Sequence, residues 1–97
     1  MNIANLQLEG LYLAIASTNR LLVEKGLVSR DDLETALRQA EQTALGDYRT
    51  EDLSSAERDA IAFAPRLLIA ANRGEATDFS ELAKIVGQTK GKYGDAI

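Results

Sequence analysis

The most constraining feature of this sequence is a run of apolar residues near its start, spaced alternately by three and four positions. Between about Asn5 and Lys25 this spacing places five residues on one stripe: Leu8, Leu11, Ile15, Thr18 and Leu22. Residues three and four apart lie on the same side of an α-helix, so the stripe predicts a long amphipathic helix. Further apolar residues widen the stripe over more than half of the circumference: Leu6, Leu13, Ala14 and Leu21. Such a helix is either central to the fold or covered by a second subunit.

Three more helices are expected after this one. Each begins at a pair of capping residues three positions apart: Ser29 and Asp32, Ser54 and Glu57, Asp78 and Glu81. Glycines that suit helix C-termini close the four segments: Gly26, Gly46, Gly74 and Gly87. Pro65 lies inside the third helix and predicts either a kink or a break near Ala64, because proline lacks the N–H and clashes with the preceding turn. The fourth helix is short, and residues 88–97 are expected to form a frayed tail.

These segments predict an all-α fold. No segment shows the alternation of apolar and polar residues that is typical of strands. The 97 residues suffice for one domain, spanning 1–97. We therefore expect a four-helix, bundle-like domain with a long first helix, a capped second helix, a proline-kinked third helix and a short fourth helix. In this arrangement the second and third helices flank the first, and the fourth closes one end.

The absence of cysteine and histidine excludes many kinds of chemistry. The chain contains neither residue, so thiol nucleophiles, imidazole bases, zinc fingers and iron–sulfur clusters are excluded. The acidic segment that begins at Asp47 fails the test for an EF-hand, because its sixth position is Asp52 rather than glycine and its twelfth is Arg58 rather than glutamate. We therefore expect no catalytic activity, no cofactor and no metal site.

The charge distribution favours a basic partner over a nucleic acid. The net charge is −4, and residues 29–53 account for the excess of acidic groups. This sign opposes binding that depends on neutralising phosphates. Asp31, Asp32 and Glu34 form an acidic face at the start of the second helix, and we expect them to contact a basic protein, with electrostatics supplying steering more than affinity.

The width of the apolar surface favours association of two copies. A small domain with few aromatic residues often completes its core by pairing, and the first and third helices are apolar on more than one side. The residues expected at the homodimer interface are Leu8, Leu11, Ile15 and Leu22. Arg20 and Arg66 interrupt the best candidate membrane spans, so a cytoplasmic protein without a membrane segment is expected. The predicted function is that of a non-catalytic interaction, regulatory or adaptor module.

The C-terminal end offers an alternative function. Residues 82–87 are similar to the first helix and turn of a DNA-binding helix-turn-helix, and Lys90 and Lys92 fall where phosphate contacts are made. The sequence departs from that pattern at Gln88, where an apolar residue is usual, and Gly91 and Gly94 weaken a second helix. This resemblance implies a nucleic-acid-associated regulator that uses residues 82–97.

Overall fold

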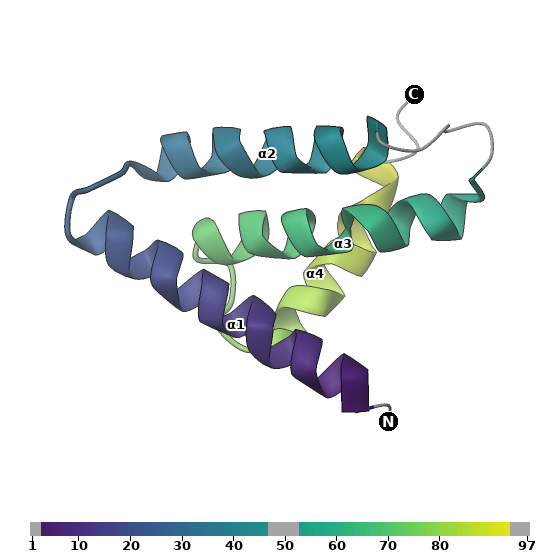
Figure 1. Ribbon diagram of the computed structural model, residues 1–97, viewed down its shortest axis with the longest axis horizontal. Coiled ribbons are helices and arrows are strands. Elements are labelled where there is room, and N and C mark those ends of the chain that lie inside the picture. Colours follow the sequence, from purple (N-terminus) through teal and green to yellow (C-terminus); the bar gives the residue numbers. More distant parts are fainter. Residues whose placement is uncertain (1–2, 47–52, 94–97) are drawn as a thin grey trace.

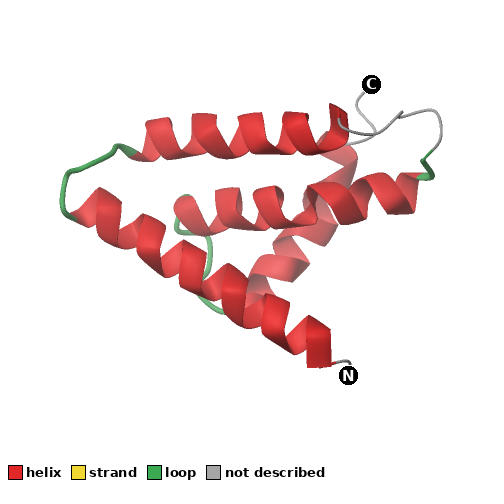
Figure 2. Cartoon of the chain, viewed as in Figure 1, coloured by secondary structure: helices red, strands yellow, loops and turns green. Residues whose placement is uncertain are grey.

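Helices are the only regular elements in the described part of the chain, residues 3–46 and 53–93 of the computed structural model. Figures 1 and 2 show how these helices are arranged. They are α1 (Ile3–Glu24), α2 (Arg30–Gly46), α3 (Ser55–Asn72) and α4 (Phe79–Tyr93). The described residues contain no strand, and the prediction of an all-α fold is confirmed.

Local side-chain caps determine where three of the helices begin. At α3, the Glu57 N–H donates to Ser54 Oγ at 3.1 Å, and the Ser54 N–H donates to Glu57 Oε1 at 3.0 Å, which completes a capping box. The return bond from the Ser54 N–H lowers the pKa of Glu57. At α2 the Asp32 N–H donates to Ser29 Oγ at 3.0 Å, and at α4 the Glu81 N–H donates to Asp78 Oδ1 at 2.7 Å. All three predicted helix starts are confirmed.

Glycine ends two of the helices as predicted. Gly26 has φ +72°, a left-handed conformation that glycine adopts without steric cost. Its N–H donates to the Val23 carbonyl and the Leu27 N–H donates to the Leu22 carbonyl, each at 3.0 Å, which is the Schellman pattern that closes α1. Gly74, with φ +74°, follows α3 and donates its N–H to the Ala71 carbonyl.

The end of the fourth helix differs from the sequence-based expectation. The fourth helix does not end near Gly87: α4 continues through it to Tyr93, so residues 88–93 extend the helix instead of forming a frayed tail. A glycine inside a helix costs about 1 kcal/mol relative to alanine, which the remaining helical hydrogen bonds outweigh here. Residues 94–97 lie outside the described part of the chain. Pro65 lies within a continuous α3, so of the two alternatives predicted for this position, a kink or a break near Ala64, the break does not occur.

The central helix is α3, not α1 as the sequence-based arrangement had it. α2, α1 and α4 all pack against α3, and Figure 1 shows α2 and α1 on opposite sides of it with α4 crossing behind. The reason lies in the sequence of α3: residues 66–70 are all buried, so this stretch is covered around its whole circumference. A helix with neighbours on every side has no solvated face over that stretch.

The hydrophobic core lies between α3 and α4. Leu67 and Ala70 of α3 pack with Leu82 and Val86 of α4. Beside this cluster three partly buried rings meet: Tyr12 of α1, Phe63 of α3 and Phe79 at the start of α4. Their ring centroids are 5.9 to 6.2 Å apart, within the range in which aromatic pairs attract. This aromatic triad attaches the first half of α1 to the rest of the domain.

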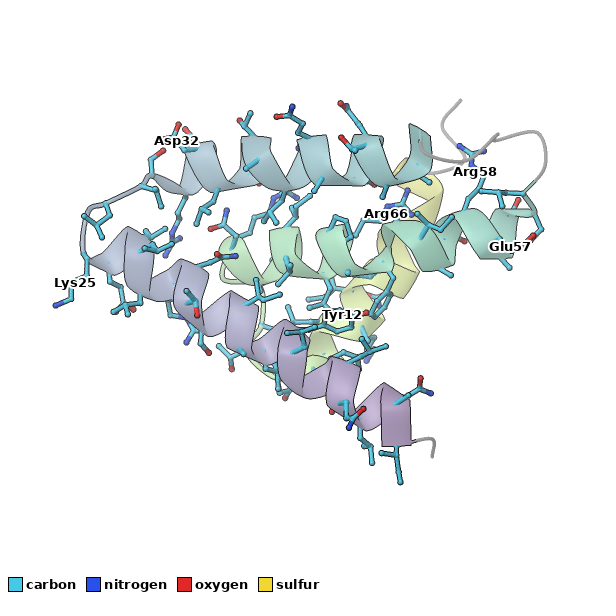
Figure 3. The ribbon with its side chains drawn as sticks, in the orientation of Figure 1. Tyr12, Lys25, Asp32, Glu57, Arg58 and Arg66 are labelled. Atoms are coloured by element: carbon cyan, nitrogen blue, oxygen red, sulfur yellow. The ribbon has the colours of Figure 1, made fainter. Side chains whose placement is uncertain are left out.

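A buried ion pair joins α2 to α3. Arg66 Nε donates to Glu41 Oε2 at 2.6 Å, and the Arg66 side chain is only 3% exposed. Arg66 Nη1 also donates to Asp59 Oδ1 at 3.4 Å. Figure 3 places Arg66 between the two helices. A guanidinium without such partners would lose its hydration in this position without compensation, so Glu41 and Asp59 are required once Arg66 is buried.

Truncating the core should destabilise the domain strongly. Leu67 is fully buried, and replacing it with alanine (Leu67→Ala) is expected to lower the free energy of unfolding by about 2–5 kcal/mol, measured by urea denaturation at a fixed protein concentration. Leu27→Ala is the matched control: Leu27 is 71% exposed, and its truncation should cost less than about 0.5 kcal/mol. Equal losses for the two variants would contradict the assigned core.

Breaking the buried ion pair should cost more than replacing it. Arg66→Met leaves Glu41 buried without its partner and is expected to lower the free energy of unfolding by about 3–5 kcal/mol. The double variant Arg66→Met, Glu41→Met removes both charges and should be more stable than Arg66→Met alone, again by urea denaturation. The single variant Glu41→Met completes the comparison. If the loss in free energy of unfolding of the double variant equals the sum of the losses of the two single variants, the two groups are not coupled.

Candidate interaction surface

One side of α1 exposes an unusual amount of apolar surface. Six large aliphatic side chains on this helix are between 36% and 73% exposed: Ile3, Leu6, Leu8, Leu11, Ile15 and Leu21. Three of the four residues expected at a dimer interface, Leu8, Leu11 and Ile15, are among them, whereas Leu22 is half-buried. Single exposed leucines are ordinary on protein surfaces, whereas a group of this size on one helix is typical of sites of association.

The exposure follows from how α1 docks. The only buried residue of α1 is Ala16, and the main side-chain anchor is Tyr12, which Figure 3 shows pointing from α1 toward the other helices. At 3.6 residues per turn, Glu9 and Arg20 fall on the same side of the helix as Ala16. Two of the three charged residues of α1 therefore lie on its inward flank, and the outward arc is nearly free of charge.

A groove lies between the first halves of α1 and α3. Its volume is about 560 Å³, within the range of protein ligand sites. Its lining residues recur at helical spacing along both helices and include Phe79: Asn5, Leu8, Glu9, Tyr12, Ala56, Asp59, Ala60, Phe63 and Phe79. The surface is mainly apolar, and Glu9 and Asp59 are the charged groups in it. Leu8 belongs both to this groove and to the exposed stripe of α1, so the two surfaces are continuous.

The acidic residues expected to bind a basic partner separate into two kinds. Asp31 and Asp32 are exposed, and Figure 3 shows Asp32 on the outer side of α2. Glu34 instead faces α3, where Arg73 donates to both of its oxygens, at 2.8 and 3.0 Å. Arg38, one turn along α2, donates to Glu34 at 3.3 Å. Two arginines thus offset the charge of Glu34, and the prediction of a basic partner rests on Asp31 and Asp32.

The arginine contacts change the titration of Glu34. The hydrogen bonds from Arg73, together with its positive charge and that of Arg38, lower the pKa of Glu34 from 4.5 to about 2. Partial burial acts in the opposite direction and is outweighed. This network links α2 to the end of α3, at the opposite end of the helix pair from the capping box.

The helix-turn-helix alternative loses the turn on which it depends. Gly87 lies inside the continuous helix α4, so residues 82–93 do not form two helices separated by a turn. Lys90 and Lys92 lie on the last turns of α4, and their side chains fall outside the described residues. No observation in the described part of the chain favours contact with nucleic acid.

Sequence reasoning did not find the groove, the aromatic triad or the long-range ion pairs. The partners in these contacts are far apart in the chain: Arg66 and Glu41 are separated by 25 residues, and Arg73 and Glu34 by 39. One signal was present for the buried pair. Arg66 interrupts an apolar run that extends from Ala62 to Ala71, and a charge at such a position needs a buried counter-charge.

Searches of the described structure and of known proteins give no further indication of a site. No group of three or more His, Cys, Asp or Glu residues suited to a metal ion occurs among the residues described. None of the described helices combines the length and apolar character needed to cross a bilayer. No protein-family model, curated protein or solved structure matches the chain.

The lowered pKa of Glu34 predicts a specific dependence of stability on pH. A carboxylate with a lowered folded-state pKa stabilises the fold above its unfolded pKa of 4.5, and this contribution is lost as the pH falls toward about 2. Glu34→Gln should therefore lower the free energy of unfolding at pH 7 by about 1 kcal/mol, the magnitude of partly exposed ion pairs.

The comparison is made by urea denaturation at several pH values. The difference in free energy of unfolding between Glu34→Gln and the unmodified chain should shrink as the pH is lowered from 5 to about 2. Glu75→Gln, at an exposed position after α3, is the control and should show no such convergence. A difference for Glu34→Gln that is constant with pH would contradict the ion-pair assignment.

Proposed function

We propose that this protein is a non-catalytic interaction module that acts as a homodimer, with α1 at the subunit interface. The observation that carries the proposal is the exposed aliphatic surface of α1. Burying it against a second copy removes apolar side chains from water, which is the main favourable contribution to association. A domain of this size gains more stability from such burial than a larger domain would, because it buries a smaller share of its surface by itself.

The extent of the surface supports a dimer interface over chance exposure. A helix of 22 residues is about 33 Å long and about 10 Å wide, so its side surface is about 1,000 Å². The uncharged outward arc covers about half of it, about 500 Å², near the upper limit for a patch on a monomer. A stable interface buries about 800 Å² on each partner, and the adjoining groove provides further apolar surface to reach that area.

The same arrangement leaves other surfaces available for recognition. In such a dimer α2 lies on the far side of α3 from α1, so Asp31 and Asp32 of both copies stay in solvent. A basic protein is the partner that this charge favours, and its approach would be accelerated by two acidic sites per dimer. The proposed protein is therefore a small adaptor in which α1 forms the dimer interface and α2 carries the acidic residues that bind a basic partner.

The solution mass tests the proposal directly. The unmodified chain is expected to have a mass near 21 kDa by light scattering during size exclusion, twice its 10.5 kDa, at both low and moderate salt concentration. Leu11→Glu places a charge at the centre of the exposed surface and should shift the mass to that of the monomer.

The control is a substitution of equal charge elsewhere. Gln39→Glu lies at an exposed position of α2 and should leave the dimer intact. A monomer of the unmodified chain at micromolar concentration would overturn the proposal, as would a Leu11→Glu variant that still elutes as a dimer. The helical content of each variant, measured by circular dichroism, distinguishes loss of pairing from loss of folding.

A further inference from the structure

The stripe on the side of α1 is symmetric about its own centre. The positions Ala4, Leu8, Leu11, Ile15, Thr18 and Leu22 are spaced by four and three residues in alternation. This spacing is the same in both directions along the chain, with its midpoint at Leu13. Two copies of α1 that run antiparallel therefore bring Leu11 of one copy opposite Ile15 of the other, twice, around a two-fold axis.

The charges of α1 distinguish an antiparallel pair from a parallel one. The first half, residues 3–13, contains Glu9 as its one charged residue, whereas residues 14–25 contain Arg20, Glu24 and Lys25. The first half carries a net charge of −1, and residues 14–25, which include Lys25 one residue beyond the end of α1, carry +1. Antiparallel pairing sets each half alongside the half of opposite net charge, and parallel pairing sets like beside like; because Glu9 and Arg20 lie on the inward flank of α1, this is a long-range preference and not a set of ion pairs across the stripe. Antiparallel helix dipoles add to this preference.

The groove lies beside the half of α1 that the second half of an antiparallel partner helix would cover. The first half of α1 lines one side of the groove. In an antiparallel pair, the second half of the partner's α1 would face this half. Thr18 would then lie opposite Leu8, and Leu22 opposite Ala4. The apolar stripe and the apolar groove form one continuous contact surface.

We propose that two copies of this chain pair through antiparallel α1 helices centred on Leu13, with Leu8 opposite Thr18 of the second copy and Leu11 opposite Ile15. The inference rests on the homodimer proposed above and specifies its orientation and register. Since the native chain contains no cysteine, engineered cysteines can report the register without interference.

The test uses single-cysteine variants of the full chain. Leu8→Cys and Thr18→Cys are mixed, allowed to exchange under reducing conditions, and oxidised. A disulfide needs Cα atoms about 4.4–6.8 Å apart. In the proposed pair the two Leu8 positions are about 15 Å apart, ten residues along the helices, so neither variant should cross-link with itself. The mixed dimer, identified by mass spectrometry, should exceed either self-linked dimer by at least about tenfold.

A neighbouring position provides the matched control. Ser17→Cys is one residue from Thr18 and also exposed, but it lies off the stripe; mixed with Leu8→Cys, it should give no more cross-link than either variant alone. Self-linked Leu8→Cys as the main product would overturn the proposal in favour of a parallel pair. Failure of all the variants to cross-link, at a reduced mass of about 21 kDa, would overturn this register and leave the homodimer standing. A reduced mass of 10.5 kDa would overturn both.

Discussion

The burial of Arg66 is the constraint on which the arrangement of α2 and α3 depends. A guanidinium that is 3% exposed must be surrounded by acceptors, and Glu41 and Asp59 provide them from two helices. The pair fixes how α2 is placed along α3, because a shift of one turn would separate Arg66 from Glu41 by about 5 Å. Apolar packing alone tolerates such shifts far better than a buried charge does, so the ion pair supplies orientation where leucines and alanines supply attraction.

With α2 and α4 fixed on α3, only a narrow part of the α3 surface is left for α1. Tyr12 and Ala16 occupy it, and large aliphatic side chains of α1 such as Leu8, Leu11 and Leu21 remain exposed. In the proposed dimer these exposed side chains would be buried against the second copy. Within one chain, Ala16 is the one buried residue of α1.

The features that sequence reasoning predicted correctly are those decided within a few residues. The capping pairs at Ser29, Ser54 and Asp78 form the expected hydrogen bonds because both partners lie on one helical turn. Gly26 and Gly74 end helices because their left-handed conformation costs glycine little. Gly87 shows the limit of this reasoning: the same residue type inside α4 is held in the helix by its neighbours.

The features that were missed depend on which surfaces meet. Periodicity shows that a helix has an apolar face, but it does not show which of several apolar helices takes the centre. The sequences of α1 and α3 both show a wide apolar face. The central position of α3 is decided by residues 66–70, which are buried around the whole circumference of the helix. The ion pair of Glu34 was missed for the same reason, since its partner Arg73 lies 39 residues away in the sequence.

The attachment of α1 through so few side chains also affects the dynamics of the domain. An element held mainly by Tyr12 and Ala16 is expected to detach at a lower free energy than the α2, α3 and α4 assembly needs to unfold, which would divide the chain into two units of unequal cooperativity. Pairing of two α1 helices would join these units, because the partner binds the docked helix and opposes its release. The persistence of the native state would then depend on protein concentration, and dilution would loosen α1 before it affected the core.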